Sequence, residues 1–147
     1  MASPDDPHWR AGAIDSARFD LLYAVIDKGP DIPVLEYLQS GGDPNLRSRE
    51  FGWTLLHAAA FKGRRALVAA LVAAGADLDA LTHQGFTPLA SAAHKGHLGC
   101  VKVLLAAGAS LNCEPLGRPL VESLQYASVK SEEMVALLLA ASAEAQR

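Results

Sequence analysis

One apolar pattern recurs four times along the chain at an almost constant step. Each copy has a valine followed three and four residues later by apolar side chains, and the steps between successive valines are 34, 33 and 34 residues. An i, i+3, i+4 spacing places these side chains on one face of a helix. A single copy cannot bury such a face, whereas stacked copies can, so the pattern predicts a repeat architecture. The four sets are Val34, Tyr37 and Leu38; Val68, Leu71 and Val72; Val101, Leu104 and Leu105; and Val135, Leu138 and Leu139.

The residues between these sets repeat as well. Residues 54–60 read Thr-Leu-Leu-His-Ala-Ala-Ala, and residues 87–93 read Thr-Pro-Leu-Ala-Ser-Ala-Ala, 33 positions later. Thr87 followed by Pro88 is typical of a helix start, with a capping hydroxyl and then proline at the first helical position. Glycines at 63 and 96, and at 75 and 108, are placed to end two successive helices in each copy. We therefore expect two helices per copy, followed by a turn or a hairpin-like finger.

This unit resembles the ankyrin repeat, whose signature is roughly a glycine turn, Thr-Pro-Leu-His-x-Ala-Ala, and a Val…Leu-Leu helix ending in Gly-Ala-Asp. Residues 85–109 and 52–77 match it well, and the resemblance covers about residues 15–143. It implies an all-α solenoid of about four helix–turn–helix repeats with short finger turns. We predict an N-terminal tail over residues 1–13 and a repeat domain over 14–147, with approximate repeats 14–53, 54–86, 87–117 and 118–147.

The outer copies depart from the signature. The first has Asp20-Leu21-Leu22-Tyr23 where Thr-Pro-Leu-His belongs, and one extra residue precedes Gly52. The last lacks one residue before Pro119 and has Ser142 at the expected helix-ending glycine. Terminal repeats must present a wetter outer face, so we expect both outer repeats to act as caps.

Composition excludes several classes of protein. The net charge is −3, without the surplus of lysine and arginine that a nucleic-acid binder needs. Two cysteines cannot make a disulfide-rich secreted scaffold. The chain has no secretory signal and no apolar run long enough to span a membrane, so we expect a cytoplasmic protein.

No catalytic, cofactor-binding or metal-binding motif is present, and we expect neither a cofactor nor a metal. Cys100 and Cys113 lack a Cys-x-x-Cys partner, and we expect Cys100 to be packed on a helix. His57 stands at the signature histidine, for which the resemblance implies a structural role: bonding neighbouring backbone and tying repeats together. An enzyme or ligand-binding protein using His57, His94 or Cys100 would instead need a concave pocket with convergent ionisable groups.

The resemblance also implies that partners meet the finger tips and the first helices, which line a concave face. Four of the nine aromatic residues, Phe51, Trp53, Phe61 and Phe86, fall at these positions and would be interface anchors if exposed. Alternatively, Trp53 and Phe61 fold back and fill a groove between repeats. The predicted partner-binding residues are Glu50, Phe51, Trp53, Phe61, Lys62, His83, Gln84, Phe86, His94, Lys95 and Arg118.

Three lysines, Lys28, Lys62 and Lys95, each precede a glycine. Stacked repeats would align them in a row on the inner face, near the finger-tip residues Arg47, Arg49 and Arg118. Such a row would suit an acidic loop or peptide and could add cation–π contacts. It could equally be a solvated face, because a lysine at this position also favours the helix dipole. Asp27 and Glu50 dilute its positive field.

We interpret the chain as a non-catalytic protein–protein interaction module. It would be a monomeric cytosolic adaptor or inhibitor that binds one folded protein through a preformed surface. A bacterial immunity protein that neutralises a toxin or enzyme, and a self-associating structural protein, are alternatives. An enzyme is the alternative that the sequence supports least.

Overall fold

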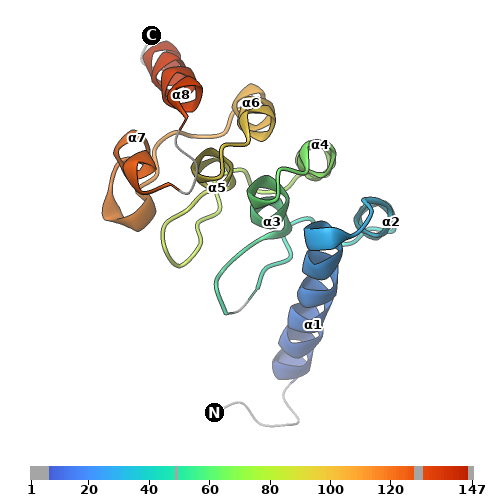
Figure 1. Ribbon diagram of the computed structural model, residues 1–147. Coiled ribbons are helices and arrows are strands. Elements are labelled where there is room, and N and C mark those ends of the chain that lie inside the picture. The colour runs from blue at the N-terminus through green and yellow to red at the C-terminus, as the bar shows by residue number, and fades with distance from the viewer. Residues whose placement is uncertain (1–6, 49, 128–130, 146–147) are drawn as a thin grey trace.

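The computed structural model describes residues 7–48, 50–127 and 131–145. Its helices form pairs that stack side by side, with α1, α3, α5 and α7 in one row and α2, α4, α6 and α8 in the other (Figure 1). This confirms the predicted all-α solenoid of helix pairs. The pairs are α1 (Pro7–Lys28) with α2 (Ile32–Gln39), α3 (Leu55–Phe61) with α4 (Arg65–Ala73), α5 (Pro88–His94) with α6 (Leu98–Ala106), and α7 (Leu120–Ser123) with α8 (Glu132–Ala145).

Threonine caps start the two central first-row helices. The hydroxyl of Thr87 accepts a hydrogen bond from the backbone N–H of Ala90 at 3.1 Å, and Pro88 occupies the first turn. Thr54 caps α3 in the same way, and the N–H of Thr54 donates in return to Nδ1 of His57 at 3.2 Å. These reciprocal bonds satisfy backbone donors that a helix start leaves without partners.

Small and branched apolar residues build a core that runs through the stack. Alanines cover α3 and α5 on their buried sides and let neighbouring helices approach closely. In the second row, Val68, Leu71, Val101 and Leu104 are fully buried, as the repeated apolar pattern predicts. Leu139, in the last helix, is 53% exposed because no further repeat covers it.

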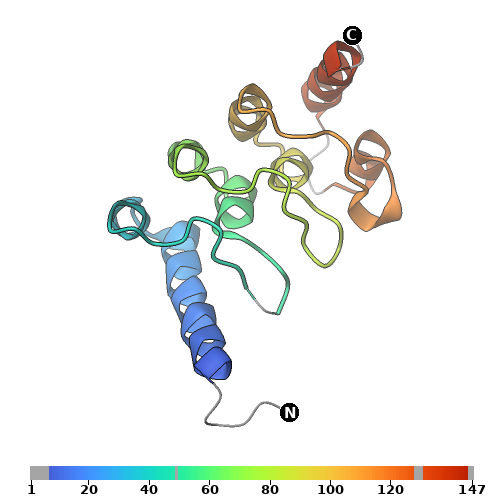
Figure 2. The ribbon, with the colours of Figure 1, turned by 180° about the vertical axis from the view of Figure 1, so that it is seen from behind.

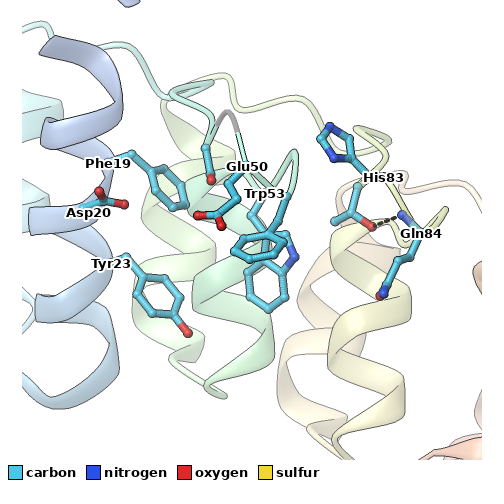
Figure 3. A pocket seen from close by; sticks show the side chains of 10 residues that line it. Phe19, Asp20, Tyr23, Glu50, Trp53, His83 and Gln84 are labelled. Atoms are coloured by element: carbon cyan, nitrogen blue, oxygen red, sulfur yellow. Dashed lines mark hydrogen bonds between the residues drawn. The ribbon is translucent and has the colours of Figure 1, made fainter. Parts of the chain in front are cut away.

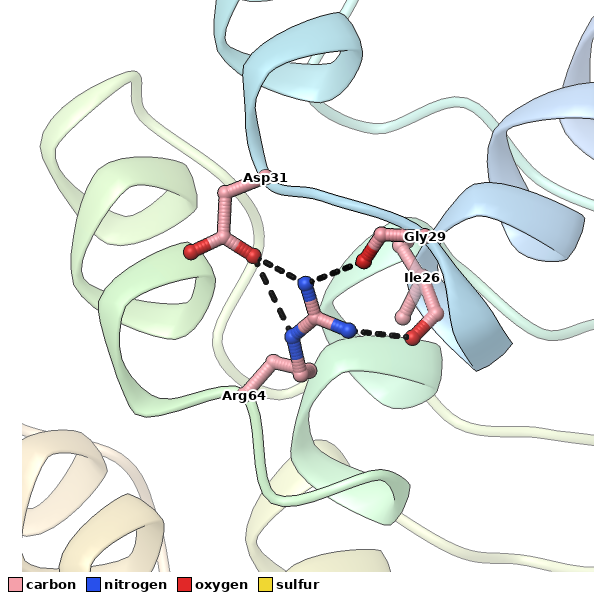
Figure 4. A network of polar contacts seen from close by, with 4 residues as sticks. All are labelled: Ile26, Gly29, Asp31 and Arg64. Atoms are coloured by element: carbon pink, nitrogen blue, oxygen red, sulfur yellow. Dashed lines mark hydrogen bonds and ion pairs between the residues drawn. The ribbon is translucent and has the colours of Figure 1, made fainter.

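Arg64 joins the first two helix pairs (Figure 4). Its guanidinium donates to the carbonyl oxygens of Ile26 at 3.1 Å and Gly29 at 2.7 Å, and it pairs with Asp31. A cation at the carbonyl end of α1 is favoured by the helix dipole. His97 lies 33 positions later, and its Nε2 is 3.0 Å from the carbonyl oxygen of Phe61. The same repeat position therefore ties the second pair to the first and the third pair to the second.

The two ends of the stack differ in helix length. Helix α1 has 22 residues, whereas α3 and α5 have seven each. Helix α1 begins at Pro7, within the segment 1–13 that was predicted as a tail, and residues 1–6 lie outside the described residues. Helix α7 has only four residues and continues as a 3₁₀ turn, η2 (Leu124–Tyr126). None of the described helices is both long and apolar enough to cross a lipid bilayer.

Candidate binding groove

The connections between helix pairs form three fingers, which we define as residues 40–54, 74–87 and 107–119. The first and second fingers extend to the same side as the N-terminal half of α1 in both views (Figures 1 and 2). Backbone hydrogen bonds link successive fingers. The N–H of His83 donates to the carbonyl of Phe51 at 3.2 Å, and the N–H of Leu116 donates to the carbonyl of Gln84 at 3.1 Å. The fingers therefore form a continuous, mutually supported edge.

A pocket of about 540 Å³ lies between α1 and the first two fingers (Figure 3). We call it the finger pocket. Its walls are aromatic and polar side chains from three separate segments of the chain. These are Phe19, Asp20 and Tyr23 from α1, Ser48, Glu50, Phe51 and Trp53 from the first finger, and Thr82, His83 and Gln84 from the second.

A second hollow of about 210 Å³ continues from the finger pocket across α3 and α5. It shares Trp53, Thr82 and Gln84 with the finger pocket, so the two form one groove. Its other walls carry one more ring from each of the two central repeats and a lysine. The remaining lining residues are Phe61, Phe86, Ser91, His94 and Lys95.

Trp53 is the centre of the aromatic wall. Its ring meets that of Tyr23 edge-on at 6.2 Å between centroids and that of Phe61 at 5.1 Å. Trp53 and Phe61 thus fold back on neighbouring repeats, as the alternative interpretation held, yet both are half-buried and still line the groove. Phe51 is 59% exposed at the rim. Packing between rings fixes the wall while leaving part of each face open.

The predicted partner-facing residues are not all at the surface. Glu50, Phe51, His83, Gln84 and Arg118 are exposed, and Trp53, Phe61, Lys62, Phe86 and Lys95 are half-buried. Neither Lys62 nor Arg118 lines the groove, and the Arg118 guanidinium lies 5.3 Å from the centre of the Tyr126 ring.

The expectation of an exposed His94 is wrong. His94 is only 8% exposed, and its Nε2 lies 2.8 Å from the hydroxyl oxygen of Ser123. Its ring also packs edge-on against Phe86, and burial lowers the pKa of His94. The fourth repeat covers this side chain, which the signature of a single repeat does not reveal.

The predicted lysine row does not form an open cationic strip. Lys62 pairs with Asp27, which raises the pKa of Lys62 and lowers that of Asp27. The Lys95 ammonium lies 4.6 Å from the centre of the Phe61 ring, and that of Lys62 lies 5.4 Å from it. Two of the three cations therefore converge on one ring. Lys28 is exposed, and Arg49 lies outside the described residues.

The charge of the finger pocket has the opposite sign to the predicted row. Among the described residues, its lining includes two carboxylates, Asp20 and Glu50, and neither lysine nor arginine. Both acidic residues are exposed, and neither forms an ion pair within the part of the chain that the structure describes. The pocket is therefore aromatic and acidic.

Sequence reasoning missed six groove-lining residues: Phe19, Asp20, Tyr23, Ser48, Thr82 and Ser91. The repeat spacing does indicate Phe19, because Phe19 stands 34 residues before Trp53 and Trp53 stands 33 residues before Phe86. Applying the repeat offset to the degenerate first copy would have added Phe19 to the aromatic positions.

His57 has the structural role that the resemblance implied. Its Nδ1 accepts from Thr54, so Nε2 carries the proton and donates to the carbonyl of Phe86 at 2.8 Å, in the next repeat. Burial lowers the pKa of His57 to about 4, which keeps the ring neutral near pH 7.

The thiols of Cys100 and Cys113 are also buried, and burial raises the pKa of both, so both stay protonated. The predicted packing of Cys100 is confirmed. Among the described residues, no three histidine, cysteine or acidic side chains gather in a cluster that could hold a metal ion.

A model of three ankyrin repeats matches residues 21–115, about two thirds of the chain. The matched segment runs from the middle of α1 to the third finger, so it contains most of the groove-lining residues.

Proposed function

Because the chain belongs to the ankyrin repeat family, whose repeats generally mediate protein–protein interaction, we propose that it binds one folded protein partner without catalysis of its own. The partner would occupy the groove and contact the finger tips. The protein would act as a cytoplasmic adaptor or inhibitor and would itself be a monomer. Its two cysteines are free, which suits a reducing compartment.

The aromatic wall of the groove carries this proposal. Six rings from α1, α3 and the first two fingers line one continuous hollow, and aromatic side chains are frequent anchors of protein interfaces. The ring of Phe51 is the most accessible of them. Covering it with a partner would contribute about 1.5–3 kcal/mol. The rings are Phe19, Tyr23, Phe51, Trp53, Phe61 and Phe86.

The linked fingers support binding by a preformed surface. Besides the backbone bonds between finger tips, the amide oxygen of Asn45 accepts from the N–H of Asp77 at 2.6 Å. The carboxylate of Asp79 accepts from the N–H of Ser110 at 2.9 Å one repeat later. A surface that is already ordered loses little conformational freedom on association, so more of the contact energy remains as affinity.

Affinity capture with paired variants tests the proposal. The wild-type chain, Phe51→Ala and a control variant, Leu139→Ala, are immobilised in parallel, since both variants remove an exposed apolar side chain. We expect a protein that wild type and Leu139→Ala retain and Phe51→Ala loses. With the purified pair, calorimetry should give a 1:1 complex that Phe51→Ala weakens about tenfold or more.

Two results would contradict the proposal. In one, Leu139→Ala weakens the purified complex as much as Phe51→Ala does, which would place binding outside the groove. In the other, light scattering shows that the protein is a dimer at high concentration and that Phe51→Ala makes it a monomer. This would favour the self-associating alternative.

A further inference from the structure

We infer that the finger pocket receives a cationic side chain, the lysine or arginine of a basic segment on the partner protein. This inference rests on the proposed function and specifies the chemistry that the groove would recognise.

The two carboxylates enter the finger pocket from different segments. Asp20 comes from α1 and Glu50 from the first finger, and the Glu50 carboxylate lies among the rings of Phe19, Tyr23 and Trp53 (Figure 3). Neither has an ion-pair partner among the described residues, whereas Asp27 and Asp31 are paired with cations of the next repeat. No cation among the described residues therefore forms an ion pair with either acidic group of the finger pocket.

The rings around these carboxylates favour the same kind of ligand. The face of an aromatic ring is electronegative and attracts a cation placed over it. Tyr23, Phe51 and Trp53 supply three accessible or half-buried rings to one pocket, the buried Phe19 lies behind them, and hydrogen-bond acceptors lie beside them. An anionic group would meet two like charges here, and a purely apolar group would leave both carboxylates partly desolvated without compensation.

Lysine and arginine side chains match both features. Each has an apolar stem that packs on rings and a charged head that donates several hydrogen bonds to carboxylates. A volume of about 540 Å³ accommodates one such side chain and the backbone on either side of it. The groove then continues past Trp53 towards Phe61 and Phe86, so a peptide segment, rather than an isolated amine, would use its whole length.

Peptides that differ in one central residue test this inference. We would titrate the full-length protein with seven-residue peptides of identical apolar flanks and a central arginine, lysine, citrulline or norleucine. The readout is the indole N–H signal of Trp53 in ¹H–¹⁵N spectra, distinguished from that of Trp9 by Trp9→Phe. We expect saturable shifts with arginine and lysine, at least about tenfold weaker binding with the two neutral residues, and weakening by added salt.

Paired variants show whether the carboxylates cause the preference. Asp20→Asn with Glu50→Gln keeps the shape of the pocket and removes both charges, so the arginine and norleucine peptides should then bind equally. The control, Glu36→Gln with Glu122→Gln, changes the net charge by the same amount at exposed positions outside the groove and should keep the preference.

The outcomes separate this inference from the proposed function. Equal binding of arginine and norleucine peptides to wild type, or binding of no peptide, overturns the cationic pocket. So does a captured partner that is lost by Phe51→Ala but held equally by Asp20→Asn with Glu50→Gln. In that last case the proposed function stands. If no partner is retained through Phe51 while the arginine preference is observed, the cationic pocket stands and the proposed function fails.

Discussion

The two ends of the stack depart from the central repeats in opposite directions. At the N-terminal end the first helix is three times as long as α3, and its residues Phe19 and Tyr23 form a wall of the finger pocket. At the C-terminal end α7 is shortened to four residues, and Ser123 closes over His94. The long first helix adds a wall to the groove, whereas the last helix pair covers the His94 side chain.

A single repeat position shows the same contrast. Phe19, Trp53 and Phe86 stand at equivalent positions, each one residue before the start of the Thr-Pro-Leu-His segment, and all line the groove. The corresponding residue of the last repeat is Arg118, whose guanidinium lies over Tyr126 instead. The aromatic wall therefore ends where the fourth repeat begins, and the proposed partner surface lies towards the N-terminal end.

The largest difference in stability should be between truncating a leucine in the centre of the stack and truncating one at its C-terminal end. Leu104→Ala removes a fully buried side chain and should lower the free energy of unfolding by about 2–5 kcal/mol. Leu139→Ala removes the same atoms from an exposed site and should cost less than about 0.5 kcal/mol. Urea unfolding followed by circular dichroism measures both. Equal losses would show that α8 is covered rather than a terminal face.

Acid should weaken the centre of the stack through His57. Its pKa is about 4 in the folded protein, below the ordinary value of 6.5, so the unfolded chain takes up the proton first as pH falls. The stabilisation is complete above about pH 6.5 and is lost towards pH 4, by roughly 3 kcal/mol. Urea unfolding between pH 7.5 and 4.5 measures this loss, to which the buried His94 adds in the same direction.

Histidine variants separate the contributions to this pH dependence. His57→Asn should remove most of the slope, whereas His83→Asn, at an exposed position, should leave it unchanged. If the free energy of unfolding still falls with pH in His57→Asn, the acid sensitivity would instead come from His94, where the third helix pair meets the fourth.

The sequence predicts the stacked helix pairs well because the residues that determine them recur at a regular spacing. The valine steps, the threonine caps and the helix-ending glycines each recur at the same offset, and each acts within one repeat or between adjacent repeats. The buried roles of His57 and Cys100 follow from the same register.

The groove was harder to predict, because its chemistry depends on contacts that the repeat does not encode. Asp20 and Glu50 face one pocket only because α1 runs beside the first finger, and the length of α1 has no counterpart in the repeat signature. The predicted lysine row failed for a similar reason. Asp27 of the first repeat pairs with Lys62 of the second, and this depends on side-chain positions across an interface.

Arg64 tests how firmly the N-terminal end is attached. Arg64→Ala removes its bonds to Ile26, Gly29 and Asp31 and should cost about 1.5–3 kcal/mol, less where water screens the partly exposed guanidinium. Hydrogen exchange should become faster in α1 and α2 while α6 stays protected. The control is Arg65→Ala, at an exposed neighbouring position. Equal exchange in both variants would mean that core packing alone holds the first repeat.

The smallest effect should be a gain of stability at the third finger. Leu116 has φ 58° and ψ 26°, in the left-handed region that disfavours residues with a Cβ atom, and Gly117 follows it at φ 73°. Leu116→Gly should relieve this strain and raise the free energy of unfolding by about 0.5–1 kcal/mol, after the entropy that glycine adds to the unfolded chain. Leu81→Gly is the matched control, because both leucines are 50% exposed and Leu81 is not among the described residues with positive φ, so it should destabilise. If Leu116→Gly also destabilises the protein, packing of the Leu116 side chain contributes to stability. The third finger would then be part of the packed C-terminal end of the stack. If Leu116→Gly stabilises the protein, the Leu116 side chain contributes nothing to folding. The two ends of the stack would then differ in their helices and not in their fingers.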